Sequence, residues 1–265
     1  MAIVSFLSAK GSPGVTTTAL LAAALWPRPA VLLEADPAGG DVAARVPALD
    51  GGVLDPDRGL LPLLTSARRG LSAAQVLEQT QHVAGGSRVV VGLGSSEQSL
   101  AAGAGWSALA VAVRGLDRGA EPVDVVVDAG RVGAHAVHLD LLRASDLVVL
   151  VVRAEVAAVL HARERLRALG GALRRPDGLL PRLGTVVVAD LRRRARDADE
   201  AADVLTAVGA WADDFGRLPL DPAGARVFDG ALASRPERTA LVRAGRTLVT
   251  DLFTAAHGGT AGRAA

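Results

Sequence analysis

SAKGSPGVTTT, at residues 8–18, is a glycine-containing loop between two apolar segments. Residues 2–7 before it predict a buried β-strand, and residues 19–25 after it are rich in helix-forming alanine and leucine. This order suits phosphate binding, because glycines permit a tight turn and the N–H groups that open the helix point at the anion. The stretch predicts an anion site, with Thr16 or Thr17 as the helix cap and as a ligand for Mg²⁺.

The loop matches the pattern G-x-x-x-x-G-K-[ST] of phosphate-binding P-loops only in part. Gly14 and Thr16 fit, whereas Ala9 stands at the first glycine and Val15 stands at the lysine. A lysine does occur nearby, because Lys10 lies directly before the glycine at position 11.

The loop resembles the deviant Walker A loop, KGGxGK[ST], of the MinD/ParA family. The residues that match are Lys10, Gly11, Gly14, Thr16 and Thr17. Two positions depart from it: Ser12 replaces a glycine, and Val15 replaces the lysine that cradles the phosphates. The resemblance implies that the nucleotide contacts the whole loop, namely Lys10, Gly11, Ser12, Pro13, Gly14, Val15, Thr16 and Thr17.

Lys10 is the only lysine among the 29 lysine and arginine residues, so the other 28 (29 − 1) are arginines. Chance placement of a sole lysine in this loop is improbable, which favours a functional role. In the family, the corresponding lysine reaches across a dimer to the partner's nucleotide. The resemblance therefore implies a catalytic role for Lys10 and a nucleotide-dependent homodimer.

An acidic segment follows the next apolar run, which spans residues 30–34. The sequence ADPAGGD at residues 35–41 places Asp36 at the carboxyl edge of the predicted sheet, where open parallel sheets bind ligands. It resembles the D-x-D-P-x-x-G-D stretch of the family, with Glu34 at the first aspartate. The resemblance implies that Asp36 is catalytic and positions the attacking water or the metal. The alternative is an acidic turn that caps a helix at residues 41–46.

The sequence VDVVVD, at residues 123–128, reads as a buried strand that ends in an acid. It resembles the Walker B strand, which implies that Asp128 holds Mg²⁺, together with Thr16 and Asp36. A turn-forming aspartate is the alternative. His135 and His138 lie three residues apart, and such a pair without acidic or cysteine partners is more often on the surface than in a metal site.

Two later segments bear on the nucleotide base and on DNA. FGRLPLDP, at residues 215–222, resembles the family segment that flanks the base, and Pro219 and Asp221 match it. Ala189 and Asp190 stand where the family usually places an asparagine that reads adenine. The sequence therefore does not specify whether the bound nucleotide is ATP or GTP. The basic run at residues 191–196 can bind DNA phosphates without sequence preference. We favour a solvated loop whose arginines pair with the acids at 197, 199 and 200.

Apolar runs near residues 2, 30, 88, 123, 146 and 183 alternate with helical segments. This alternation predicts an α/β fold with a mainly parallel sheet and helices on both faces, and the resemblance implies the three-layer P-loop NTPase fold. The predicted helices include residues 71–83, 97–116, 155–169, 203–208, 223–233 and 237–253. Residues 1–256 are expected to form one domain, and residues 257–265 a disordered tail without the family's membrane-targeting helix.

The net charge of +1 favours no acidic partner, and the absence of cysteine excludes disulfides and suits a cytoplasmic protein. The chain contains no apolar run near the ~20 residues that a membrane span needs, so any membrane association is expected to be peripheral, through a partner.

The resemblance implies a protein that binds ATP and Mg²⁺ and acts as a dimerising switch or positioning factor. The processes served by the family include chromosome partitioning, septum-site placement in cell division, and pilus localisation in a TadZ/CpaE-like branch. Because Val15 replaces the lysine, ATPase activity is expected to be weak or absent. The alternative is a nucleotide-free scaffold that retains only the fold. The sequence does not identify the partner.

Overall fold

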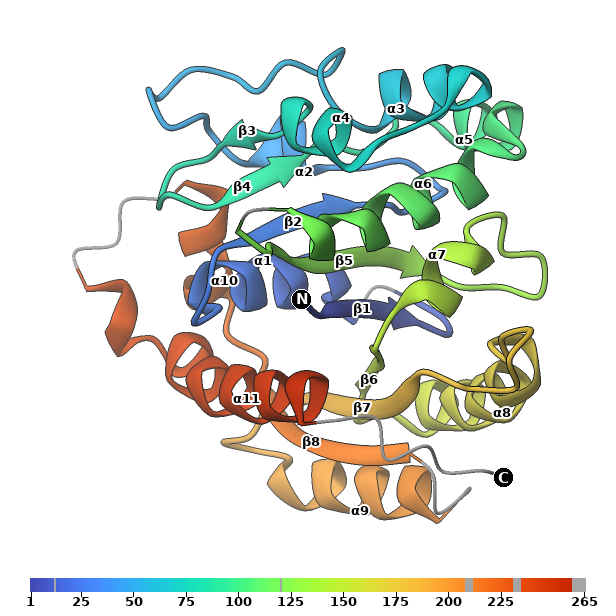
Figure 1. Cartoon of the computed structure of the whole chain (residues 1–265). Helices are drawn as coiled ribbons and strands as arrows, with labels where there is room; N and C mark the ends of the chain where they lie inside the picture. The colour runs from blue at the N-terminus through green and yellow to red at the C-terminus, as the bar shows by residue number, and fades with distance from the viewer. Residues whose placement is uncertain (12, 120, 208–211, 231–234, 259–265) are drawn as a thin grey trace.

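The computed structural model describes residues 1–11, 13–119, 121–207, 212–230 and 235–258. Its centre is an eight-stranded sheet with the order β3-β4-β2-β5-β1-β6-β7-β8 (Figure 1). The described strands pair in parallel except for β3 with β4. The strands are β1 (Ile3–Ser8), β2 (Ala30–Glu34), β3 (Gln81–His82), β4 (Arg88–Val90), β5 (Asp124–Arg131), β6 (Leu147–Arg153), β7 (Arg182–Ala189) and β8 (Ala212–Pro219).

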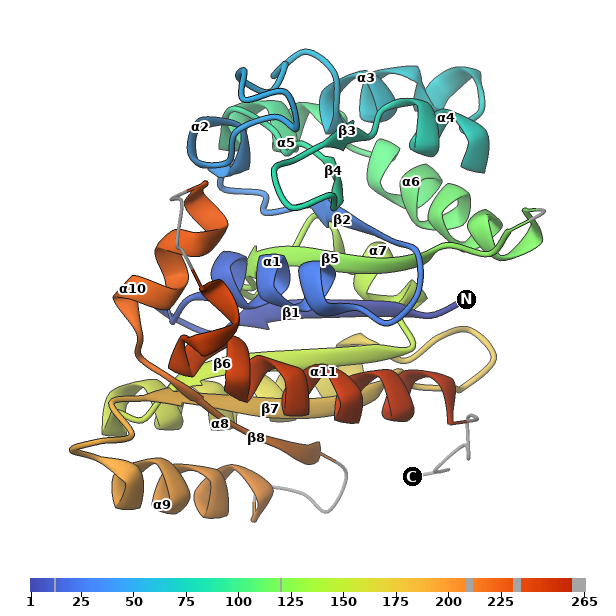
Figure 2. The same ribbon diagram turned by 90° about the vertical axis from the view of Figure 1, so that its left-hand side faces the viewer.

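Helices cover both faces of this sheet, as predicted (Figure 2). One face packs against α1 (Val15–Leu25), α2 (Val42–Arg45) and α11 (Ala240–His257), with α10 (Pro222–Ala225) beside them. The opposite face packs against α3 (Leu60–Ser66), α4 (Ala73–Glu78), α6 (Gly105–Arg114), α7 (Leu139–Ala144), α8 (Val156–Ala172) and α9 (Ala195–Thr206). The mainly parallel three-layer α/β fold is therefore confirmed.

The central strand β1 is buried along its whole length, because it has neighbours on both sides and helices on both faces. Its sequence IVSFLS is apolar at Ile3, Val4, Phe6 and Leu7, which is typical of a strand in a parallel sheet, and the two serines are buried with them. The loop of residues 9–14 follows this strand and leads directly into α1.

Several predicted helices differ from those observed. The helix predicted at residues 203–208 belongs to α9, which begins at Ala195, and the helix predicted at residues 237–253 is α11, which begins at Ala240 and ends at His257. The helix predicted at residues 71–83 begins as expected, with Ser72 in a capping box, but it ends at Glu78, and Gln81–His82 forms an edge strand. The helix predicted at residues 97–116 is divided by Gly103 (φ 48°) into α5 (Ser96–Ala102) and α6. The segment predicted as a helix at residues 223–233 forms α10 and a 3₁₀ turn (Arg226–Asp229), and residues 231–234 lie outside the described residues.

The last helix extends one residue beyond the boundary predicted at 256, so the predicted tail is wrong at His257. The His257 ring packs on Phe253, with 4.1 Å between ring centroids, and its Nε2 lies 3.2 Å from Asp124 Oδ2. Residues 259–265 of the predicted tail lie outside the described residues.

No single helix in the described part of the chain has the length and apolar character needed to cross a membrane. One pair of helices, Ser96–Ala102 and Gly105–Arg118, meets the length and composition requirements together but bends by 82°.

Candidate functional site

The loop after β1 turns through two glycines with positive φ, Gly11 (φ 72°) and Gly14 (φ 96°). Residues other than glycine adopt this conformation at a cost of roughly 1–2 kcal/mol. Gly14 is the N-cap of α1, and apart from the adjoining backbone the described structure has no atom within 4 Å of where a Cβ would stand at either glycine. Neither threonine caps the helix, so that prediction is wrong: Thr16 and Thr17 lie inside its first turn.

Asp128 lies across from this turn on β5 and is 1% exposed. Its Oδ1 accepts a hydrogen bond of 3.0 Å from the Gly130 N–H. The nearby Thr16 side chain lowers the pKa of this carboxyl group. Burial nevertheless raises the pKa of Asp128 to about 6. Its Oδ2 is buried and has no hydrogen-bond partner among the described residues. A free carboxylate oxygen beside a hydroxyl fits a hard cation such as Mg²⁺.

Asp36 follows β2 at the same edge of the sheet. Its side chain packs on Gly130, where a Cβ would overlap the Asp36 carboxyl group. Burial raises the pKa of Asp36, against the hydrogen bond from the Ala38 N–H (2.8 Å) and the charge of Arg131. The charge of Asp36 in turn raises the pKa of Asp128. The fold thus brings together the three residues predicted to hold Mg²⁺, Thr16, Asp36 and Asp128.

Glu34 is a buried acid at this edge to which the sequence analysis gave no role. It is paired with Asp128 across β2 and β5 and is 1% exposed. Its carboxylate accepts hydrogen bonds from the N–H groups of Asp41 (2.7 Å), Val42 (2.9 Å) and Gly92 (2.8 Å).

Burial raises the pKa of Glu34 to about 7. Its hydrogen bond with the Val42 N–H makes Glu34, and not Asp41, the acid that caps the start of α2, since Asp41 makes no side-chain capping bond. The sequence did contain a signal, namely glycines at positions 40 and 92. The Glu34 carboxylate occupies the space where a Cβ would stand at each of them.

Pro219 is the last residue of β8 and pairs with Ala189 at the end of β7, and Asp221 follows two residues later. The Asp221 carboxylate accepts hydrogen bonds from the N–H groups of Gly224 (3.0 Å) and Leu241 (3.1 Å). It thereby fixes the starts of α10 and α11, a structural role that the sequence analysis did not foresee.

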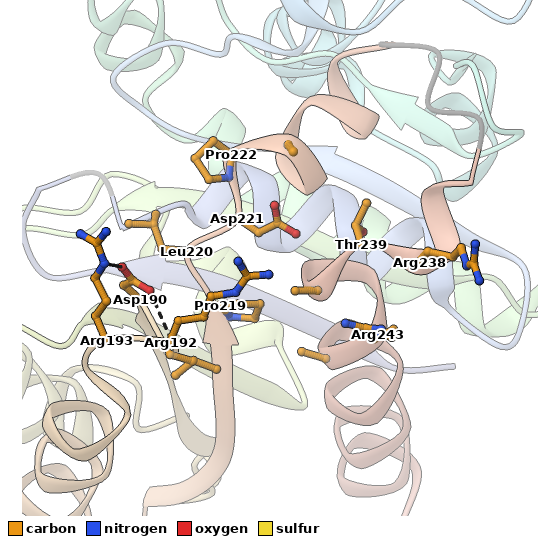
Figure 3. Close-up of a pocket in the computed structure, with 14 residues that line it drawn as sticks. Asp190, Arg192, Arg193, Pro219, Leu220, Asp221, Pro222, Arg238, Thr239 and Arg243 are labelled. Carbon is orange, nitrogen blue, oxygen red and sulfur yellow. Dashed lines mark hydrogen bonds and ion pairs between the residues drawn. The ribbon is translucent and has the colours of Figure 1, made fainter.

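These strand ends line a cavity of about 840 Å³ (Figure 3). Its lining also includes Asp190, Arg192, Arg193, Arg238 and Arg243.

The remaining loop residues have varied positions. Lys10 is exposed, and its Nζ lies 3.2 Å from Nε2 of His161 on α8. Val15 is 7% exposed and packs in the core that α1 forms with the sheet. Pro13 is buried, and Ser12 lies outside the described residues.

The basic run after β7 forms ion pairs with nearby acids. Arg196 pairs with Glu200 at 2.9 Å, and Arg194 lies 3.5 Å from Asp197. Arg193 lies 3.9 Å from Asp190. The pairing predicted with Asp197 and Glu200 is therefore present, but Asp199 pairs with Arg217, and the end of the run is not a loop, because α9 begins at Ala195.

His138 does not lie on the surface as the sequence analysis proposed. It is fully buried, its Nε2 lies 3.2 Å from the Ala129 carbonyl, and its ring packs on Trp106. Burial lowers the pKa of His138 to about 4. No group of three or more His, Cys, Asp or Glu side chains in the described residues is arranged to hold a metal ion.

No protein-family profile and no curated protein sequence matches the chain. Solved structures do resemble it. The cell division ATPase MinD of Pyrococcus furiosus is 21% identical, with a TM-score of 0.67 over 96% of this chain and 98% of that one. The septum site-determining protein MinD of Pyrococcus horikoshii, complexed with Mg-ADP, is 19% identical, with a TM-score of 0.66 over 95% of each chain.

A ParA family ATPase from Chlorobium tepidum is 15% identical, with a TM-score of 0.70 over 94% of this chain and 98% of that one. The chain therefore has the fold of the MinD/ParA-family ATPases.

Proposed function

We propose that the protein binds ATP and Mg²⁺ and acts as a dimerising switch or positioning factor in partitioning, septum-site placement or pilus localisation. One observation carries this proposal: the open glycine turn at the start of α1 stands beside Thr16 and Asp128, whose buried Oδ2 has no hydrogen-bond partner among the described residues. A solved structure of similar fold, the P. horikoshii MinD, is complexed with Mg-ADP.

Each residue of the site has a distinct proposed role. The N–H groups of the turn and of the first turn of α1 would bind the phosphates. Thr16 and Asp128 would hold Mg²⁺, which neutralises phosphate charge when bound. Asp36, whose pKa is raised by burial, is placed to orient a water molecule at the same edge.

Hydrolysis is expected to be weak or absent because Val15 is apolar and packs in the core. A charged hydrogen bond to phosphate contributes roughly 1.5–3 kcal/mol, so its loss weakens binding by about 10–150-fold. A site with a micromolar dissociation constant that is weakened by this factor is still occupied at millimolar nucleotide. Hydrolysis is affected more, since charge on the phosphates also has to be stabilised in the transition state.

A nucleotide-dependent homodimer is the assembly that we propose. Lys10 is exposed in the loop that contains the glycine turn, and within the described residues its side chain forms a hydrogen bond with His161 alone. An exposed lysine at this position is free to reach a second subunit.

A nucleotide-free scaffold is the second candidate function. Two observations favour it: Val15 is buried as an ordinary core residue, and the Asp221 carboxylate is occupied by two backbone N–H groups. Under this alternative the glycine turn is a remnant of the fold.

A titration with a fluorescent ATP analogue, with and without Mg²⁺, separates the two candidates. We expect the wild type to bind in a Mg²⁺-dependent manner and Asp128→Asn to lose the effect of Mg²⁺. Asp203→Asn, at an exposed position on α9, is the matched control and should bind like the wild type. Absence of binding at millimolar ligand would instead support the scaffold.

Sedimentation velocity on the same samples tests the dimer. The wild type should dimerise only with nucleotide, and Lys10→Ala should bind nucleotide as a monomer. Dimerisation of Lys10→Ala at the wild-type concentration would contradict the proposed role of Lys10.

A further inference from the structure

Both strands that flank β1 end in an arginine. β5 ends at Arg131 and β6 ends at Arg153, while the glycine turn follows β1 between them. Val15 leaves that turn without the lysine of the P-loop pattern. A triphosphate placed beside Asp36 and Asp128 needs compensating positive charge, so the position of these two arginines bears directly on the site.

A bulge in β5 places Arg131 on the α1 side of the sheet. The register pairs Phe6 with Asp128 and then Ser8 with Arg131, so β5 contains one more residue than β1 over this interval. The extra residue is accommodated at Gly130, whose φ is 58°. Residues paired across parallel strands share a face, so Arg131 lies on the face of Ser8 and Phe6. Phe6 belongs to the core that packs on α1.

Arg153 reaches the same face without a bulge. Along β6, Val149 and Val151 pack in the core beneath α1, whereas Val148, Leu150 and Val152 pack in the opposite core. Arg153 continues the first series, because side chains alternate between the two faces of a strand. The last recorded pair of the two strands is Leu7 with Leu150, so Arg153, three residues further along β6, lies beyond the end of β1 at Ser8, on the side where the loop begins.

Both guanidinium groups are available to a ligand. Neither Arg131 nor Arg153 forms a side-chain hydrogen bond or an ion pair with any residue in the described ranges. Arg131 is exposed and Arg153 is half-buried. The charge of Arg131 lowers the pKa of Asp36, which places this arginine near the acids of the site. Lys10, by contrast, is directed at His161.

We propose that Arg131 and Arg153 together bind the phosphates of the nucleotide and replace the missing lysine of the loop. This inference rests on the proposed function. A guanidinium group presents two parallel N–H donors to a phosphate, which makes arginine an effective phosphate ligand. Two such groups, on strands either side of the turn, supply from the sheet the charge that the loop lacks.

The test compares Arg131→Gln, Arg153→Gln and the double variant by titration with Mg-ATP and with inorganic tripolyphosphate. We expect each single variant to bind both ligands about tenfold more weakly or worse, as for loss of a charged hydrogen bond. Arg246→Gln, at an exposed position on α11, is the matched control and should bind normally. Thermal unfolding verifies that all variants fold.

Adding Val15→Lys to the double variant tests the replacement itself, and we expect it to recover binding. A folded triple variant without recovery would contradict the proposal, as would wild-type affinity in the double variant; in that second case the proposed function still stands. Tripolyphosphate binding that depends on both arginines, without any nucleotide binding, would support the phosphate site and refute the proposed function. Binding of neither ligand by the wild type would refute both.

Discussion

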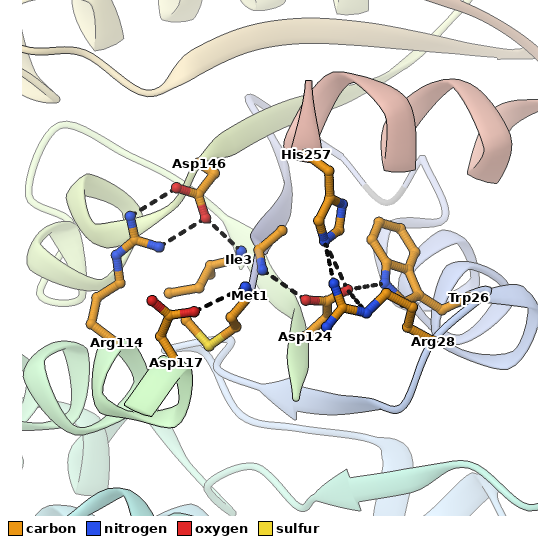
Figure 4. Close-up of polar contacts among 10 residues, drawn as sticks. Met1, Ile3, Trp26, Arg28, Arg114, Asp117, Asp124, Asp146 and His257 are labelled. Atoms are coloured by element: carbon orange, nitrogen blue, oxygen red, sulfur yellow. Dashed lines mark hydrogen bonds and ion pairs between the residues drawn. The ribbon is translucent and has the colours of Figure 1, made fainter. Parts of the chain in front are cut away.

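Two aspartates on one strand, Asp124 at the start of β5 and Asp128 near its end, are both buried but have opposite surroundings. Asp124 Oδ1 accepts a hydrogen bond from the Ala2 N–H (2.7 Å), and its Oδ2 accepts one from Trp26 Nε1 (2.9 Å) and lies 3.2 Å from His257 Nε2 (Figure 4). Asp128, in contrast, has an oxygen without a hydrogen-bond partner in the described part of the chain.

The same contrast holds for the two edges of the sheet. At the amino edge, Asp146 accepts hydrogen bonds from the Ile3 N–H and from both terminal nitrogens of Arg114, each at 2.8 Å. At the carboxyl edge, the pKa values of Glu34, Asp36 and Asp128 are all raised, with burial as the largest cause. The acids of the amino edge are paired with donors, whereas at the carboxyl edge Asp128 retains a carboxylate oxygen that a cation would stabilise, although Glu34 there is held by backbone N–H groups.

The largest expected effect is at the amino edge. Asp124→Asn places an amide N–H₂ against donors and removes a charge that faces His257 and Arg28. We expect the free energy of unfolding to fall by about 3 kcal/mol, because buried donors lose their acceptor. Urea denaturation measures it. A loss below about 1 kcal/mol would show that the amino edge does not depend on its acid.

The pH dependence of stability tests Glu34. Its pKa is 4.5 in the unfolded chain and about 7 in the folded protein. Between these values the unfolded state loses its proton first, so stability falls as the pH rises from 4.5 to 7, and the full penalty applies above pH 7. Glu34→Gln cannot ionise. The stability of this variant relative to wild type should therefore rise over this interval by roughly 3 kcal/mol.

His138 changes stability in the opposite sense, because its pKa is lowered to about 4 and stability falls as the pH drops below 6.5. The comparison of Glu34→Gln with wild type cancels this effect, since both proteins contain His138. A difference between the two proteins that is independent of pH would contradict the raised pKa of Glu34.

The bulge at Gly130 is tested by Gly130→Ala. The positive φ and the overlap with Asp36 should lower the free energy of unfolding by about 1–2 kcal/mol and weaken nucleotide binding. Gly133→Ala is the matched control, because the space beside Gly133 is open and its φ is not positive. Equal behaviour of the two variants in chemical denaturation and in ATP titration would refute the role of the bulge.

The smallest effect on stability is expected for Asp128→Asn. The raised pKa of Asp128 shows that its charged form is destabilised in the fold, so the neutral amide should leave the free energy of unfolding unchanged within about 1 kcal/mol at pH 8, or raise it. Stabilisation of the protein by Mg-ATP should disappear, as thermal unfolding with and without ligand will show. A loss of stability as large as that of Asp124→Asn would remove the distinction between the two edges.

Local sequence pattern predicted the repeated elements and part of the site. Six apolar runs became strands, because buried parallel strands need nearly continuous apolar sequence. Prediction was wrong where a turn interrupts an apolar stretch, as at Gly103 and before the edge strand Gln81–His82. The role of Glu34 was missed because its donors meet only in the folded chain: the N–H groups of Asp41 and Val42 at the start of α2, and the N–H of Gly92, which follows β4 and is 58 residues away.

By itself the sequence determined the order of strands and helices, the glycine turn before α1, and the acids near the carboxyl ends of β2 and β5, since periodicity and residue type specify these features locally. Only the tertiary structure decided how each polar group is used. In the fold, the Asp221 carboxylate binds backbone N–H groups at the starts of α10 and α11, and His138 is buried. The fold also brings Arg131 and Arg153 to one face of the sheet, beside the glycine turn. The physical reason is strand register: one bulged residue decides which face a side chain occupies, and register depends on pairing between segments more than a hundred residues apart.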